Sequence, residues 1–178
     1  RLMASNLHPI FVHFTVALFS ISFLLYLAVY LLRFRNNTLI KFSNELEITA
    51  RWCLWIAALI TIFTALAGLY AFNTVRHDAG SHIAMTNHRN WAIPTASAII
   101  FLSIWSLWDY YKNRRAKTLF LIGSLITQVL LISTAWRGGE LVFRYGLGVM
   151  SLPKSDATYH HHREKVEVPI KEKIPHSH

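Results

Sequence analysis

Long apolar runs separated by short basic segments dominate the chain. The runs cover about residues 10–32, 52–72, 91–110 and 119–136, and the third helix is expected to begin earlier, near residue 82. Each run approaches the roughly 20 residues that an α-helix needs to cross the hydrocarbon core. Leu, Ile, Ala and Phe fill them without the alternation of a barrel strand. The pattern therefore predicts an all-α integral membrane four-helix bundle within residues 1–150, with helices at 10–32, 52–72, 82–110 and 119–136.

The composition changes from residue 151 onward. Lys, Glu, Pro and His replace the apolar residues, and no period remains, so we expect an extended polar C-terminal tail over residues 151–178. The tail carries His160, His161, His162, His176 and His178. Such a tract can hold metal, although surface histidines without fixed geometry usually bind metal adventitiously.

The charge of the chain has a simple explanation in its placement. Of 178 residues, 53% are hydrophobic and 15% are charged, which indicates one membrane domain despite a net charge of +9. The basic residues gather between helices 1 and 2 and between helices 3 and 4: Arg33, Arg35, Lys41 and Arg51, then Lys112, Arg114, Arg115 and Lys117. Cytoplasmic loops carry such an excess. We therefore expect no nucleic-acid partner but a multi-pass protein of the bacterial inner membrane, with its N-terminus and tail in the periplasm. The first run is too long for a cleavable signal peptide.

Five histidines crowd the predicted periplasmic end: His8, His13, His77, His82 and His88. Ionisable side chains in or beside a spanning helix are costly, so they indicate function. His13 lies about two turns into helix 1 and His88 at a comparable depth in helix 3, and these helices can face each other diagonally across a bundle. One imidazole from each side of a cavity suits the iron of a haem. His13 and His88 are therefore the predicted axial ligands, with His8 and His82 as a reserve pair.

The cofactor predicted for this pair is haem b. Cys53 is the only cysteine, which excludes the C-x-x-C-H attachment of a c-type haem. Small residues follow both preferred ligands at helical spacing, which leaves room for a flat ligand. Two alternatives remain open. Small stripes also let membrane helices approach closely without any cofactor, and three histidines with Asp78 or Glu140 could instead hold Cu or Zn.

The predicted end of helix 4 adds a glycine pair and two arginines. Gly138 and Gly139 permit close backbone approach. Arg137 is the predicted partner of a haem propionate, because the guanidinium fork suits a carboxylate. The alternative is a helix end followed by a turn, with Arg137 and Arg144 solvated.

Three motifs together resemble a bacterial family of four-helix membrane proteins. They are His8-Pro9-Ile10-Phe11-Val12-His13-Phe14, Asn87-His88-Arg89 and Gly138-Gly139-Glu140-Leu141-Val142. Members of that family open with H-P-x-x-V-H-F and close with a segment like G-G-x-L-V-Y-x-H-G-V-G, so the resemblance covers about residues 7–149. It implies a likeness to b-type membrane cytochromes and function beside Rieske or cytochrome c modules. The chain departs from the pattern at Tyr145, where the family commonly has histidine, and a ligand there would be lost or replaced.

The leading hypothesis is an electron-transfer subunit that binds b-type haem near the periplasmic face. It would relay electrons between a quinone or membrane partner and a periplasmic cytochrome c within a larger respiratory or redox complex. No nucleophile, acid-base pair or phosphate loop indicates substrate chemistry, so we expect a non-catalytic subunit. The alternatives are a cofactor-free accessory or assembly subunit and a Cu- or Zn-binding membrane protein.

Overall fold

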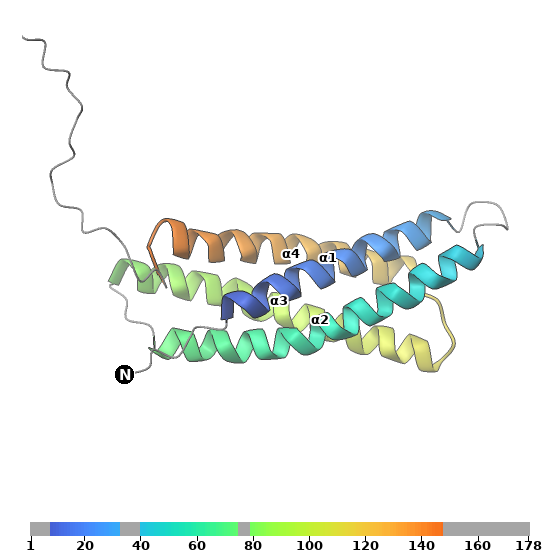
Figure 1. Ribbon diagram of the computed structural model, residues 1–178, viewed down its shortest axis with the longest axis horizontal. Coiled ribbons are helices and arrows are strands. Elements are labelled where there is room, and N and C mark those ends of the chain that lie inside the picture. The colour runs from blue at the N-terminus through green and yellow to red at the C-terminus, as the bar shows by residue number, and fades with distance from the viewer. Residues whose placement is uncertain (1–7, 33–39, 75–78, 148–178) are drawn as a thin grey trace, which may run out of the picture.

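Four antiparallel helices form an elongated bundle in the computed structural model (Figure 1). The structure describes residues 8–32, 40–74 and 79–147. Helix α1 covers His8–Leu32, α2 Ile40–Thr74, α3 Ala79–Tyr111 and α4 Thr118–Phe143. We call the end at which α1 and α3 begin the histidine end and the opposite end the basic end. The predicted tail lies outside the described residues.

The helices extend beyond the apolar runs that predict them. Helix α2 begins at Ile40 rather than near residue 52, because the polar stretch before Trp52 continues the helix past the hydrocarbon core. Helix α4 continues through Gly138 and Gly139 to Phe143. At the histidine end, α2 and α4 extend beyond the first residue of α1 (Figure 1). Pro9 lies in the first turn of α1, where a residue needs no intrahelical N–H bond, so proline suits this helix start.

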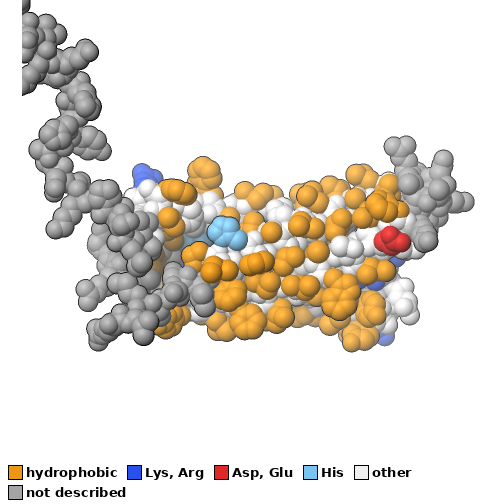
Figure 2. Space-filling model, in the orientation of Figure 1, with side chains coloured by type: hydrophobic (Ala, Val, Ile, Leu, Met, Phe, Trp, Pro, Cys, Tyr) orange, Lys and Arg blue, Asp and Glu red, His pale blue; other side chains and the backbone are white. Residues whose placement is uncertain are grey.

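All four helices are long and apolar enough to span a membrane, which confirms the predicted fold class. Large apolar side chains face outward along their length, among them Leu24, Leu66, Phe101 and Ile132 at 59–61% exposure. Figure 2 shows hydrophobic side chains spread over the visible face of the bundle. Such a surface suits acyl chains rather than water.

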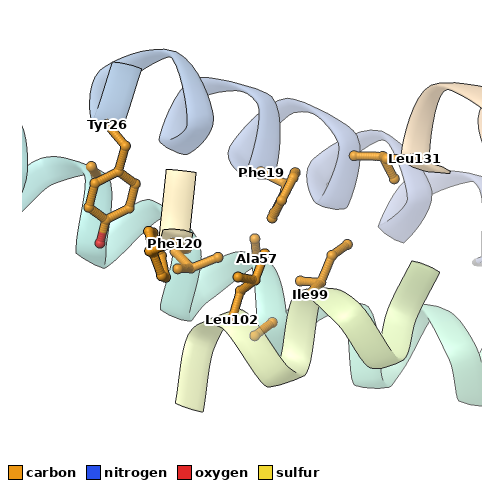
Figure 3. Packing of buried hydrophobic residues seen from close by; sticks show 10 residues of the cluster. Phe19, Tyr26, Ala57, Ile99, Leu102, Phe120 and Leu131 are labelled. Carbon is orange, nitrogen blue, oxygen red and sulfur yellow. The ribbon is translucent and has the colours of Figure 1, made fainter. Parts of the chain in front are cut away.

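The interior combines aromatic packing with small hydroxyl side chains. Near the basic end, Tyr26 and Phe120 meet edge to face with ring centroids 5.0 Å apart, and Figure 3 shows both within the buried cluster. Ala50 is fully buried where α1 and α2 approach closely, and its carbonyl accepts a 2.8 Å hydrogen bond from Ser22 Oγ. Small residues and interhelical hydrogen bonds hold membrane helices together, because lipid removes the hydrophobic drive between them.

The two hairpins α1–α2 and α3–α4 bury equivalent positions. Buried residues of α1 recur 80 positions later in α3: Thr15, Phe19, Ser22, Tyr26 and Val29 become Thr95, Ile99, Leu102, Ser106 and Asp109. Inward residues of α2 recur 70 positions later in α4: Ala50, Leu54, Ala57, Thr61 and Thr64 become Phe120, Ser124, Thr127, Leu131 and Thr134. Each of α1 and α3 packs against both α2 and α4. The bundle is thus an internal repeat with an approximate two-fold axis along its length.

Candidate histidine site

His8 is the first residue of α1 and turns into the bundle against α2. Its Nδ1 donates a 3.0 Å hydrogen bond to the carbonyl of Thr64. Its ring also rests on Gly68, because a Cβ placed on that glycine would lie 2.9 Å from His8 Cε1. An Nδ1–H bonded to a backbone carbonyl fixes the tautomer and the orientation of the ring, as is common for metal-ligating histidines.

His88 occupies the equivalent place in the second hairpin. Its ring rests on Gly138, because a Cβ placed on that glycine would lie 3.2 Å from His88 Cε1. The carbonyl of Thr134 lies near the ring, as that of Thr64 does for His8, but Nδ1 is buried and has no hydrogen-bond partner among the described residues. A buried polar nitrogen that lacks a well-formed hydrogen bond costs free energy.

The two histidines are related by the internal repeat. Each is followed seven residues later by a threonine that bonds a threonine of the neighbouring helix. Thr15 Oγ1 lies 3.1 Å from Thr64 Oγ1, and Thr95 Oγ1 lies 2.9 Å from Thr134 Oγ1. His8 and His88 are also close enough to interact electrostatically. Both rings thus lie at the histidine end of the bundle, one on α1 and the other on α3.

The other predicted histidines lie elsewhere. His13 is on the exposed face of α1, where its Nδ1 bonds the carbonyl of Pro9. His82 is exposed on α3 with its ring 5.8 Å from that of Phe72. His77 lies outside the described residues. Of the preferred pair His13 and His88, the structure therefore brings only His88 into the bundle, and it sets His8 in the place expected for His13.

The helical phase explains why His8 rather than His13 faces inward. Seven residues are close to two turns, so His8 continues the buried face of Thr15 and Ser22. His13 precedes Thr15 by two residues, which is about 200° of rotation and places it on the opposite face. In α3, His88 belongs to the same kind of series with Ser81 and Thr95, both 3% exposed. A seven-residue spacing of hydroxyl residues was the sequence signal for both.

Arg137 is fixed beside this site by two contacts. Its guanidinium carbon lies 4.0 Å from the centroid of the Trp91 ring, and its Nη1 donates a 2.9 Å hydrogen bond to the carbonyl of Ser133. Arg137 also lies close enough to His88 for an electrostatic interaction. Its role as a propionate partner stays a prediction.

A polar crevice opens between α3 and α4 at the same end. It has a volume of about 180 Å³ and is lined by Ile83, Ala84, Asn87, Arg137, Glu140 and Tyr145. Glu140 makes a 2.8 Å ion pair with Arg144. Beyond the membrane-spanning segment, hydrogen bonding to this carboxylate raises the pKa of Arg144. Tyr145 lines this crevice on the α3–α4 side of the bundle.

Within the described part of the chain, no group of three His, Cys, Asp or Glu side chains is placed to hold a metal ion. Asp78 lies outside that part, so a Cu or Zn site that includes it stays a prediction. Glu140 is described, and its partner is Arg144.

A buried ionic cluster at the basic end is absent from the sequence prediction. Glu47 is 4% exposed and pairs with Arg51 at 2.8 Å and with Arg115 at 3.9 Å. Arg115 also donates a 2.6 Å hydrogen bond to Asn44 Oδ1. The acidic residue in the long α2 was the available signal, since a carboxylate among basic residues at a helix end finds a partner. This cluster joins α2 to the α3–α4 connection.

The described residues define a four-helix integral membrane protein with two equivalent histidines turned inward at one end. The sequence places it more closely: the chain belongs to the family of predicted membrane proteins DUF2231, whose model matches residues 4–151. The sequence motifs predicted that about residues 7–149 belong to a family of membrane proteins, and this match agrees with that prediction. No curated protein and no solved structure matches the chain at a significant level.

Proposed function

We propose that the protein is an electron-transfer subunit of the bacterial inner membrane that binds one b-type haem at the histidine end, with His8 and His88 as its axial ligands. The relation of His8 to His88 by the internal repeat is the observation that carries this proposal. A haem iron takes one imidazole nitrogen from each side. Two equivalent histidines, one on α1 and one on α3, would provide both imidazoles from one chain.

The surroundings of the pair support the donor chemistry. The bond from His8 Nδ1 to Thr64 fixes the orientation of that ring, and Nδ1 of His88 is buried without a hydrogen bond among the described residues. Gly68 and Gly138 keep the helix surfaces flat under both rings. A haem bound here would supply one-electron redox chemistry, and the protein would set its potential through the ligands and the low polarity around them.

The space around the pair sets a condition on binding. The crevice between α3 and α4 does not lie between His8 and His88. Both rings rest on neighbouring helices, so a macrocycle requires the rings to turn away from Gly68 and Gly138 and the helix ends to separate.

The basic end supports the orientation. Arg51, Lys112, Arg114, Arg115 and Lys117 lie there, which favours the cytoplasm for that end and the periplasm for the histidines. Electrons would pass between a quinone or another membrane subunit and a periplasmic cytochrome c. The haem site then lies within reach of a partner on the periplasmic side.

The test is the absorption spectrum of the full chain, purified after expression with ample haem. We expect a Soret band and a low-spin spectrum. His8→Ala and His88→Ala should each abolish or convert the low-spin form, while His82→Ala should leave it unchanged. His13→Ala decides between the two ligand pairs. Loss of the low-spin form in His13→Ala, with His8→Ala unaffected, would return the ligand role to His13.

Absence of a Soret band would reject the cytochrome proposal. An accessory or assembly subunit without a cofactor would then remain. Metal analysis of the same sample tests the Cu or Zn alternative independently, because bound Cu or Zn would appear in stoichiometric amount without a Soret band.

A further inference from the structure

The polar crevice between α3 and α4 lies where a lipid headgroup would be. Helix α4 has 26 residues, so it is about 39 Å long and its ends pass beyond a hydrocarbon core of about 30 Å. Arg137 and Glu140 lie in the last two turns. Ile83, on the rim, is 73% exposed, and Phe143 at the end of α4 is 93% exposed. The crevice thus combines a polar interior with apolar residues that acyl chains can cover.

Arg137 is held in place with hydrogen-bonding capacity left over. Stacking on Trp91 and the bond to Ser133 fix the guanidinium plane. Its Nη2 and Nε donate no hydrogen bond to any described residue. Two N–H groups on one planar fork suit two oxygens of a phosphate. The amide of Asn87 and the hydroxyl of Tyr145 line the same crevice and add further donors.

Glu140 gives the crevice a second, opposite charge. It follows Arg137 by three residues, so the two side chains are neighbours on the helix surface at about 5–6 Å between Cβ atoms. Glu140 is 37% exposed at its side chain and pairs with Arg144, which is itself 73% exposed. A carboxylate in this position accepts hydrogen bonds from an ammonium group.

The internal repeat shows that the crevice is a specialised feature of the second hairpin. The positions of α2 equivalent to Arg137 and Glu140 are Ala67 and Tyr70. Phe11 occupies the position equivalent to Trp91 and packs on Phe63 with ring centroids 6.2 Å apart. The α1–α2 hairpin thus has an apolar contact where the α3–α4 hairpin has an arginine stacked on Trp91 and a nearby carboxylate. Helix packing alone does not require these charged residues.

We infer that this crevice binds the headgroup of an aminophospholipid, with the phosphate on Arg137 and the primary ammonium on Glu140. A phosphoethanolamine headgroup carries both groups a few ångströms apart. A choline headgroup has the phosphate but no N–H to donate, and a glycerol headgroup has the phosphate but no cation. The site therefore distinguishes lipids by their amine and does not depend on haem.

The experiment is native mass spectrometry of the full chain in detergent, titrated with phosphatidylethanolamine, phosphatidylcholine or phosphatidylglycerol of the same acyl chains. We expect phosphatidylethanolamine to bind roughly tenfold more tightly than phosphatidylcholine, the difference of about one charged hydrogen bond. Arg137→Gln should remove binding of both lipids. Glu140→Gln should equalise the two lipids while preserving binding.

The matched control is Arg89→Gln. Arg89 is also an arginine at the histidine end, with its guanidinium 4.8 Å from the Phe72 ring, but it faces α2 rather than the crevice. It should leave lipid binding unchanged. Equal affinity of the wild type for phosphatidylethanolamine and phosphatidylcholine, or equal losses in the Arg89 and Arg137 variants, would overturn the inference. Unchanged lipid binding in Arg137→Gln with weaker haem retention would assign Arg137 to a propionate instead.

Discussion

Replacing Gly68 by alanine tests whether His8 is seated as the structure shows. The new Cβ would lie 2.9 Å from His8 Cε1 and 3.1 Å from Nδ1, which is closer than such atoms pack. The ring must move, and its bond to Thr64 is then lost. Overpacking costs about 1–3 kcal/mol and the hydrogen bond about 0.5–1.5 kcal/mol, against a gain of about 1 kcal/mol from placing alanine in a helix. The net expectation is a loss of roughly 1–3 kcal/mol in the free energy of unfolding.

The assay is unfolding in mixed micelles on addition of SDS, followed by far-ultraviolet circular dichroism. Gly139→Ala is the control, because its Cβ would meet only Phe143 Cδ2 at 4.0 Å, and it should retain or raise stability. In a His8→Ala background, Gly68→Ala should no longer destabilise, since the clashing ring is gone. Equal stabilities of the Gly68→Ala and Gly139→Ala variants would refute the packing of the His8 ring on Gly68. The same loss of unfolding free energy for Gly68→Ala with and without His8 would also refute it.

Two further substitutions test the contacts that join the helices. Thr95→Val should lower the free energy of unfolding by about 0.5–1.5 kcal/mol in the same assay, because it removes the buried 2.9 Å hydrogen bond to Thr134. An unchanged free energy of unfolding would mean that this hydrogen bond does not stabilise the bundle. Glu47→Ala should cost about 1–3 kcal/mol, since it removes the buried carboxylate that pairs with Arg51 and Arg115, whereas the exposed Glu45→Ala should cost less than about 0.5 kcal/mol. Similar effects of the two glutamate variants would show that the buried ion pair is not stabilising.

The sequence predicts the helices well because hydrophobic length is a local property. Four apolar runs of spanning length leave little choice of fold, and the structure has all four. The extended start of α2 was missed because the stretch before Trp52 is polar, and helix formation outside the hydrocarbon core leaves no hydropathy signal.

The candidate site was harder to predict because it depends on helix rotation. The depth of His13 suggests a ligand, but its rotation is set by which face of α1 packs on α2, and that face contains His8 and Thr15. Glycine contacts are equally non-local. In the sequence, Gly68 and Gly138 look like ordinary helix residues. Only the fold shows that the ring of a histidine on the neighbouring helix packs against each of them.

The internal repeat has a consequence for how such a protein can arise and be rebuilt. Each hairpin contributes one inward-facing histidine, one threonine pair and one glycine against which the histidine ring packs, so each is half of the site. A gene encoding one hairpin, whose product paired with a second copy of itself, would produce the same arrangement with two identical halves. Duplication and fusion of that gene would then allow the halves to diverge. In this chain the divergence is visible at Arg137 and Glu140, where only the second half has acquired charged residues.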